Sequence, residues 1–339
     1  MKFSWVLPDN NSLNKFEDEE TFLNKNIEEA KLAERNGFDS ILVSSTPNSF
    51  DPWILATYLA MKTERIKLIV AQNTSHVLPS STLKALNTLN YITNNRIDIN
   101  VVTGSSKEGI LKDTKYLNHE IRYKRTYEFL ELLQKLRKGI CSHEGEFFQV
   151  NNATIYPKIR GEDSSSIFVA GSSNEALAAA AKFGDYHLSY ADDFPNVGEQ
   201  ISRLNNLSQR YSRSVKSGIY INIISRKTTN EAWNEAYKLI ERASPFQKRL
   251  VKLYYSNADS IGILKHNAFN KEFSNKALWG GLASISTTVS LSIIGSYGEV
   301  ADTLKKYQEL GVSFFLLLSA SNDKEIERIG NYVLPYLKM

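Results

Sequence analysis

The stretch "SIFVAGSSNEALAAAAKFGDYHLSY" (residues 166–190) contains the unit on which the fold prediction depends. An apolar run ends in Gly-Ser-Ser, an alanine-rich segment follows at once, and a second apolar run begins after Gly184. Ser or Asn directly before a helix caps its first N–H groups, and glycine commonly ends a helix. The pattern is therefore typical of a strand, a helix and a second strand.

The same order recurs along the chain. Short apolar runs rich in Ile, Val and Leu are typical of parallel strands that are buried on both faces. We expect eight such strands, at 2–7, 40–45, 66–73, 96–104, 166–173, 186–190, 217–225 and 313–321. The helices that follow them are expected at about 18–36, 52–62, 80–93, 122–137, 174–184, 196–211, 229–243 and 323–337. Eight such units predict an α/β fold, a (β/α)8 TIM barrel, rather than an open doubly wound sheet.

Two segments do not fit this repeat. Residues 138–166 resemble a loop with a short strand pair, and residues 244–296 form a long excursion before a further helix at about 297–310. Insertions on the C-terminal side of barrel strands commonly cover the active site. We therefore expect both insertions at the C-terminal face, with 244–296 as the candidate lid.

The overall composition excludes several classes of protein. The 339 residues carry 41 basic and 37 acidic side chains, a balance that does not favour a nucleic-acid groove. The single cysteine, Cys141, excludes a disulfide within the chain and a Cys-based metal site, and we predict no metal. No signal peptide and no run of about 18 apolar residues is visible. We expect a soluble cytoplasmic protein without a membrane or nucleic-acid partner.

The alternation of side chains along strands assigns faces. In the strand at 217–225, isoleucines alternate with Tyr220 and Asn222, and the isoleucines suit the face under the outer helices. Tyr220 and Asn222 should then point into the barrel near its mouth, where we favour contact with a ligand. Asp98 and Asn100 should point inward from their own strand. Asp98 lies deeper, and both a structural network and a functional role remain open for it.

Two strand ends carry small hydroxyl-rich turns. In the turn at Gly171, Ser172 and Ser173, the unpaired N–H groups of Ser172, Ser173 and Asn174 and the helix dipole would favour an anion such as phosphate. A plain helix cap is the alternative interpretation of these residues. The other turn begins at Thr103 and Gly104 within "NVVTGSS" (residues 100–106). Its residues are small enough for a flat polar cofactor to approach the backbone.

Several segments in order along the chain carry a family resemblance. They are "FSWVLP" at the start, "AERNGFDSILV" (33–43), "NVVTGSS", "LNHEIRYKRTYEFLELLQKL" (117–136), "VAGSSNEALAAAAKFGD" (169–185), "TTNEAW" (228–233), "LWGGL" (278–282) and "YGEVADTLKKYQELGVSFFLL" (297–317). With them the chain resembles the luciferase-like flavin-dependent monooxygenases, most closely the alkanesulfonate monooxygenase branch. The resemblance implies one luciferase-like TIM-barrel domain over residues 1–339.

The resemblance also implies a cofactor site. The family binds reduced FMN (FMNH2) at the C-terminal mouth of the barrel. By resemblance, Thr103 and Gly104 should lie against the flavin, and Gly171, Ser172 and Ser173 should hold its phosphate. His119 and Tyr123 should hold the flavin or its phosphate, although a purely structural His119 is the alternative.

The substrate half of the site departs from the sulfonate branch. Where that branch has a Cys, an Arg, a His, a second Arg and a Tyr, this chain has Ser49, Tyr220, Asn222, Ser286 and Ala320. A buried sulfonate without a cationic partner is strongly disfavoured, so we expect a substrate other than a simple alkanesulfonate. The catalytic positions are predicted at Ser49, Tyr220 and Asn222, and the substrate pocket at Tyr190 and Ser286.

The resemblance implies a two-component monooxygenase that uses O2 on a small or carrier-tethered substrate. A separate NAD(P)H:FMN reductase would supply FMNH2, and a homodimer or homotetramer is expected. Two alternatives remain within the same fold: a catalytically silent FMN-binding protein and an alkanesulfonate monooxygenase with a rebuilt site. An enzyme that uses deazaflavin F420 ranks lower, because "GSSNEAL" offers few basic residues for the acidic F420 tail.

Overall fold

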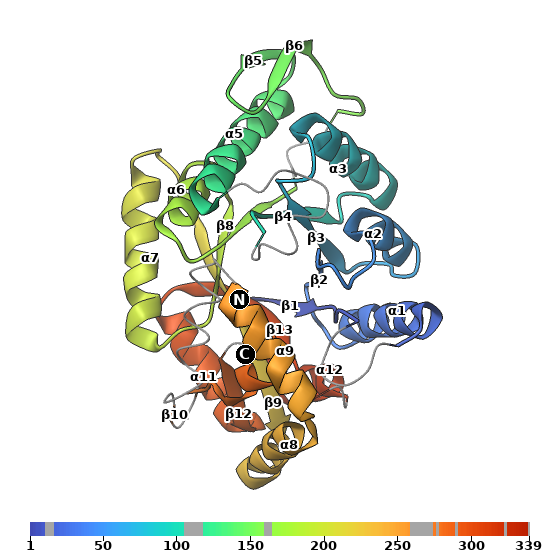
Figure 1. Cartoon of the computed structure of the whole chain (residues 1–339), viewed down its shortest axis with the longest axis vertical. Coiled ribbons are helices and arrows are strands. Elements are labelled where there is room, and N and C mark those ends of the chain that lie inside the picture. The colour runs from blue at the N-terminus through green and yellow to red at the C-terminus, as the bar shows by residue number, and fades with distance from the viewer. Residues whose placement is uncertain are drawn as a thin grey trace.

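Eight parallel strands close into a barrel in the computed structural model of the chain (Figure 1). The structure describes residues 1–10, 17–104, 118–158, 165–257, 274–275, 278–288, 291–321 and 324–337. The barrel strands are β1 (Lys2–Val6), β2 (Ser40–Val43), β3 (Lys67–Asn73), β4 (Ile97–Val102), β7 (Ile167–Ala170), β8 (Tyr186–Tyr190), β9 (Lys216–Arg226) and β13 (Val312–Leu318). They pair in the order β9-β13-β1-β2-β3-β4-β7-β8, and a pairing of β8 with β9 closes the ring. The predicted (β/α)8 barrel is confirmed.

Helices surround the barrel. They are α1 (Glu19–Arg35), α2 (Pro52–Ala60), α3 (Pro79–Thr93), α5 (His119–Lys138), α6 (Asn174–Phe183), α7 (Phe194–Gln209), α8 (Thr229–Arg242) and α11 (Tyr297–Glu309). The predicted start of α5 at about residue 122 was wrong by one turn, because the Asn118 side chain caps the helix by accepting from the Ile121 N–H. The last helix, expected at about 323–337, runs without a break through α12 (Glu325–Arg328), a π-helical turn (Ile329–Val333) and α13 (Leu334–Leu337).

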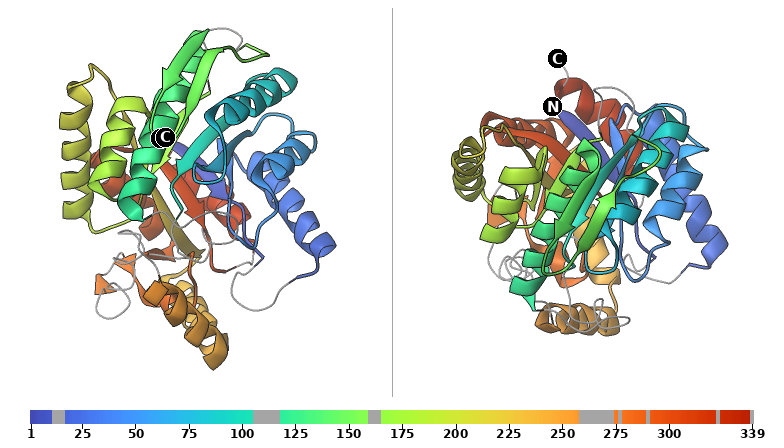
Figure 2. Two further views of the ribbon diagram at one scale, coloured as in Figure 1. Left: turned by 45° about the horizontal axis from the view of Figure 1, so that its top comes forward. Right: turned by 90° about the horizontal axis from the view of Figure 1, so that it is seen from above.

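The two insertions differ in structure. The first holds the expected strand pair, β5 (Cys141–Glu144) with β6 (Gln149–Ala153), and residues 159–164 lie outside the described part. It connects the end of α5 to the start of β7, so it lies at the N-terminal face of the barrel, opposite to α8 (Figure 2). The expectation that this insertion lies at the C-terminal face was wrong. The second contains a helix and a strand that were not predicted, α9 (Pro245–Asn257) and β12 (Ser292–Ser296). Between them lie β10 (Ser274–Asn275), β11 (Leu278–Trp279) and a 3-10 turn (Gly281–Ser284), with further residues outside the described part.

Strand β9 extends beyond its neighbours in the barrel. Residues 216–222 of β9 pair with β8 and β13, whereas residues 222–226 pair in parallel with β12. The long insertion is thereby anchored by main-chain hydrogen bonds at the C-terminal end of β9. Figure 2 shows α8 and α9 (orange) on the side of the molecule opposite to the start of β1, which is the side of the barrel mouth.

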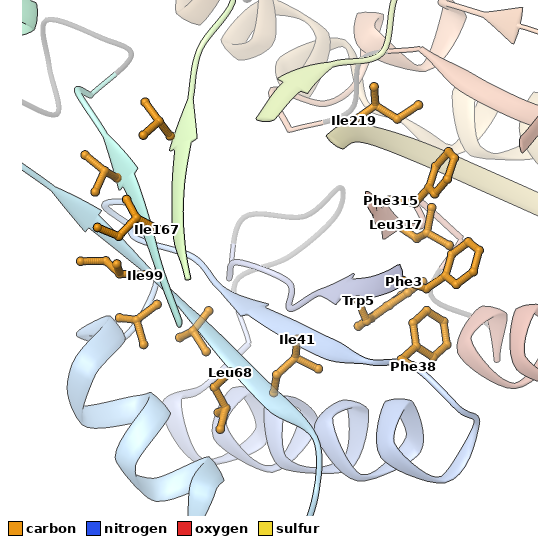
Figure 3. Close-up of a cluster of buried hydrophobic side chains, with 14 of the residues drawn as sticks. Phe3, Trp5, Phe38, Ile41, Leu68, Ile99, Ile167, Ile219, Phe315 and Leu317 are labelled. Carbon is orange, nitrogen blue, oxygen red and sulfur yellow. The ribbon is translucent and has the colours of Figure 1, made fainter. Parts of the chain in front are cut away.

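Apolar side chains fill both faces of the barrel wall. The outer set packs under the helices and includes Phe3, Ile41, Leu68 and Ile99 (Figure 3). Ile219 and its two alternating neighbours in β9 belong to the same cluster, as their pattern predicted.

A second, smaller cluster lies inside the barrel and includes Leu42, Ile69, Phe168, Leu188 and Leu316. Because faces alternate along strands, this arrangement directs the side chains between the outward residues toward the barrel axis. None of the helices in the described ranges has the length and hydropathy needed to cross a membrane.

Candidate functional site

The turns after β4 and β7 lie at the same end of the barrel and meet at one side chain. The Tyr123 ring, on α5, is buried, and its hydroxyl interacts with the side chains of Thr103 and Ser173. Burial raises the pKa of Tyr123, and these two hydrogen-bonding neighbours offset part of that shift. Tyr123 is therefore a neutral donor at ordinary pH, held between the ends of two neighbouring barrel strands.

Gly171 is confined at the same point. It adopts φ +140°, and a Cβ placed on it would lie 2.5 Å from the Tyr123 hydroxyl and 2.8 Å from the Ala176 Cβ. Only glycine therefore fits here, both for its backbone conformation and for the space beside Tyr123. The His119 ring packs against the Tyr123 ring at 4.8 Å between centroids. Five of the seven residues predicted for the cofactor thus form one contiguous group with Tyr123 at its centre.

The other two predicted cofactor residues lie in the same two turns. Gly104 follows Thr103 with φ +82°, a left-handed conformation that glycine adopts without strain. Ser172 lies between Gly171 and Ser173, whose side chain caps α6 by accepting from the Ala176 N–H at 3.2 Å. The Ser173 hydroxyl is therefore the helix cap expected as the alternative interpretation. A cap leaves the preceding N–H groups of the turn available to an anion, so the two roles are compatible.

A cation that the sequence did not indicate lies beside the start of α6. The Arg203 guanidinium, on α7, donates a hydrogen bond to the Asn174 side chain, the first residue of α6. Arg203 is 29 positions away in sequence, and only the packing of α7 against α6 brings it to this place. It adds positive charge to that of the helix dipole at this end of α6.

A buried histidine lies behind the second turn. His187, on β8, is fully buried, and its Nε2 donates to the Gly171 carbonyl at 2.7 Å. Burial lowers the pKa of His187 from its ordinary 6.5 to about 4, because the imidazolium would lose its hydration. His187 therefore remains neutral throughout the physiological pH range.

This depressed pKa predicts an acid-sensitive stability. Between pH 6.5 and 4 the unfolded chain binds a proton at residue 187 that the folded chain does not, so stability falls as the pH falls. From pH 7 to pH 5 we expect this site to lower the free energy of unfolding by about 2 kcal/mol. Urea unfolding at pH 7 and pH 5 measures this loss. The free energy of unfolding should fall less in His187→Gln than in the wild type, by about this amount. Equal pH dependence in both proteins would contradict the prediction.

Four tyrosines meet over the other half of the mouth. Tyr190 and Tyr220, from β8 and β9, contact each other edge to face at 5.3 Å between ring centroids. Tyr254 and Tyr255 of α9 lie close enough to act electrostatically on both rings. Burial raises the pKa of Tyr190, Tyr220 and Tyr255, so these phenols remain uncharged.

The predicted pocket residue Ser286 belongs to this group. Its carbonyl accepts a hydrogen bond from the Tyr255 hydroxyl at 3.2 Å, and Gln247 of α9 donates to the neighbouring Ile285 carbonyl at 2.8 Å. These bonds fix α9 against the segment before β12. Tyr254 and Tyr255 lay in the excursion and were missed. Ser244 and Pro245 are a helix-start signal that could have placed them, because the Ser244 hydroxyl caps α9 by accepting from the Gln247 N–H at 3.1 Å.

The polar groups of two residues that were predicted as catalytic, Asn222 and Ser49, are occupied by hydrogen bonds that hold the fold together. Asn222 is fully buried; its amide donates to the Ser292 hydroxyl at 2.8 Å and accepts from the Ala320 N–H at 2.7 Å. It thus joins β9 to β12 and to the end of β13. The Ser49 hydroxyl bonds to the main chain of Ser44 and Thr46 within its own loop. Tyr220 packs against the apolar cluster inside the barrel.

The two inward polar residues of β4 behave differently. Asp98 accepts from the Ser166 N–H at 2.7 Å and pairs with Lys67 at 3.5 Å, so the structural network is the reading that the contacts favour. Asn100 lies two residues closer to the mouth on the same strand and is 5% exposed. Its side-chain oxygen has no hydrogen-bond partner among the described residues. A buried acceptor without a donor is costly, and it suits a ligand N–H. The sequence placed Asn100 inside the barrel but gave it no function.

Comparison with known proteins agrees with this architecture. The structure of a riboflavin lyase with modified FMN and riboflavin is similar, with a TM-score of 0.83 and 18% identity over 99% of this chain and 91% of that chain. An EDTA monooxygenase from Chelativorans sp. BNC1 has a TM-score of 0.82 and 19% identity over 100% and 93% of the two chains. A long-chain alkane monooxygenase has a TM-score of 0.81 and 18% identity over 99% and 91%.

At these identities the similarity to solved structures establishes the fold alone. The family assignment comes from the sequence, because residues 1–313 match the family model described as luciferase-like monooxygenase. This match does not distinguish the alkanesulfonate branch from others. With more than nine-tenths of its length matched, the chain belongs to the luciferase-like monooxygenase family.

Proposed function

We propose that this protein is an FMN-dependent monooxygenase that receives reduced FMN from a separate NAD(P)H:FMN reductase and uses O2 on a small uncharged substrate. The observation that carries the proposal is the meeting of Thr103, Tyr123, Gly171 and Ser173 at one end of the barrel. These residues come from two strand ends and a helix that are far apart in sequence. Their convergence is what a single phosphorylated ring cofactor would require.

Three features of the described residues fit FMN. The turn at residues 171–173 presents main-chain N–H groups at a helix start, with Arg203 nearby, which suits a phosphate. The absence of a Cβ at Gly171 lets the Tyr123 hydroxyl pack directly against the turn, which places this donor beside the main-chain N–H groups. The unpartnered Asn100 oxygen inside the barrel suits an N–H of the isoalloxazine ring. FMN, when bound in its reduced form, would supply the electrons for activation of O2.

In this proposal the chain itself has three tasks. The turn at residues 171–173, with Tyr123 and His119, binds the phosphate end, and Thr103, Gly104 and Asn100 orient the ring. The α9 helix excludes water, because its tyrosines lie over Tyr190 and Tyr220 and its ends are fixed near Ser286. Exclusion of water is the main protection that a protein gives to reactive oxygen chemistry.

The substrate half of the mouth favours an uncharged molecule. Apart from the Asp9 carboxylate, whose negative charge acts on Tyr220, the described side chains that meet there are phenols that burial keeps neutral, and Tyr190, Tyr220 and Tyr255 all have a raised pKa. No Arg or Lys replaces the sulfonate-binding pair at positions 220 and 222. An anion would therefore lose its hydration at this place without gaining a cationic partner from those positions.

We accordingly expect no release of sulfite from short alkanesulfonates. The measurement supplies purified protein with FMN, a flavin reductase, NADPH and O2, and compares sulfite with a reaction that lacks the protein. The same assay with a mixture of uncharged aromatic and aliphatic compounds should reveal oxygenated products by mass spectrometry. Sulfite formation well above the protein-free background would refute the proposal of a rebuilt, uncharged site.

A catalytically silent FMN-binding protein is the second candidate. The structural bonds of Ser49 and Asn222 favour it, because they occupy polar groups at two positions predicted as catalytic. Fluorescence titration with FMN and FMNH2 tests both candidates at once, since both require binding. Rapid-mixing absorbance of the FMNH2 complex with O2 then separates them. A flavin reoxidised at the rate of free FMNH2, with any substrate, would support the silent protein.

A further inference from the structure

His187 controls the direction of the peptide bond that follows Gly171. Its neighbours on β8, Tyr186 and Leu188, belong to the cluster inside the barrel, so the His187 ring faces the helix layer. From there Nε2 donates to the Gly171 carbonyl at 2.7 Å, while the Gly171 N–H donates to the Leu188 carbonyl at 2.9 Å. Both main-chain polar groups of Gly171 are thus held by β8.

The geometry of the peptide bond transmits this constraint to Ser172. In a trans peptide the C=O and the following N–H point in opposite directions, and Tyr156–Pro157 is the one cis peptide in the described ranges. With the Gly171 carbonyl pulled toward the helix layer, the Ser172 N–H must point away from it. Within the part of the chain that the structure describes, no acceptor takes a hydrogen bond from this N–H.

Because residue 171 is a glycine, the turn could adopt other backbone conformations in which the Ser172 N–H points elsewhere. Glycine at φ +140° has no Cβ to restrict its rotation, so the sequence of the turn does not itself fix the orientation of the next N–H. The His187 hydrogen bond does so from outside the turn. The Tyr123 hydroxyl occupies the side of Gly171 toward which a Cβ would point.

We propose that His187 is a positioning residue that presets the turn at residues 171–173 for a phosphate group, so that it acts on recognition of the phosphate and not of the flavin ring. This inference rests on the proposed FMN site, but it concerns a residue on the helix side of β8 that does not touch the ligand. A neutral imidazole suits the task, because Nε2–H can donate while Nδ1, which has no described partner, carries only a lone pair.

The test compares FMN with riboflavin, which has the same ring and lacks the phosphate. Dissociation constants from flavin fluorescence give a phosphate preference, the ratio of the riboflavin constant to the FMN constant. In His187→Leu this preference should fall about tenfold, the usual effect of a lost hydrogen bond at a charged site, with little change for riboflavin. His187→Gln, whose amide reaches a similar point, should retain most of the preference.

Two further variants guard against a purely structural effect. Ser189→Ala removes a buried hydroxyl from the same face of β8, where it donates to Gln200 at 2.8 Å, and it should leave the preference unchanged. If His187→Leu does not fold, His187→Asn takes its place, because the shorter amide falls short of the Gly171 carbonyl. An unchanged phosphate preference in His187→Leu or in His187→Asn would overturn the inference. Equal weakening of FMN and riboflavin binding in these variants would overturn it as well. A wild-type protein with no preference for FMN over riboflavin would instead remove the proposed phosphate site.

Discussion

Gly171→Ala is expected to weaken FMN binding by roughly tenfold to a hundredfold, since a strained backbone conformation costs on the order of 1–3 kcal/mol. An alanine Cβ at this residue would lie 2.5 Å from the Tyr123 hydroxyl, a separation that real Cβ contacts do not show. Either the turn must leave φ +140° or Tyr123 must move. Either change disrupts the group of residues on which the proposed cofactor site depends.

The chain offers a matched control for this variant. Gly139, at the end of α5, has φ +138°, and a Cβ placed on it would meet no atom within 4 Å. Gly139→Ala should therefore reproduce the backbone strain without the clash, and lower stability without affecting FMN. Titration of both variants and measurement of their unfolding separate the two effects. Equal FMN affinity in wild type and Gly171→Ala would show that the turn is not part of the cofactor site.

Glu325→Ala should produce the largest loss of stability among the substitutions considered. Glu325, on α12, is 2% exposed and accepts four hydrogen bonds, from the Ser225 N–H at 2.6 Å, the Ser225 hydroxyl at 2.5 Å, Arg226 at 2.6 Å and Arg328 at 3.5 Å. Removal of the carboxylate leaves the Ser225 N–H without its partner, and leaves the largely buried Arg226 charge with a carboxylate only at 3.9 Å, that of Glu235. Breaking a buried pair in this way costs about 3–5 kcal/mol.

A surface ion pair provides the control for Glu325. Glu131 pairs with Lys135 at 3.0 Å on the exposed side of α5, and Glu131→Ala should change stability by about 0–1 kcal/mol. Urea unfolding at pH 7 measures both variants. Since Glu325 joins α12 to the end of β9, its removal should also loosen the attachment of the C-terminal helices. A loss no larger than that of Glu131→Ala would contradict the prediction, and would mean that the Ser321 hydroxyl at 2.9 Å and the Glu235 carboxylate at 3.9 Å suffice for the Arg226 charge.

Much of the fold was open to prediction because its signals are local. Each barrel strand is a short apolar run, and most helices carry their own start signal, such as Ser173 before α6 or Asn118 before α5. The eightfold repeat of these signals is sufficient for a barrel. The strand β12 was missed because it is defined by its pairing with a distant strand, and α9 was missed although Ser244 and Pro245 mark its start. Its position over the mouth depends on packing that the sequence does not show.

The sequence by itself determined the barrel and the identity of the two small turns, Thr103–Gly104 and Gly171–Ser173, since strand ends, caps and glycines are written in neighbouring residues. Only the tertiary structure decided what those turns contact. Three side chains from different elements lie at the second turn or at the helix start that follows it: Tyr123, His187 and Arg203. Their positions in the sequence do not show that they are close in space. The same holds for Asn222, whose inward position followed from strand alternation while its partners, Ser292 and Ala320, depend on how distant segments pack. Hydrogen bonds and clashes act over a few ångströms in space, and only the closed barrel brings these residues within that range.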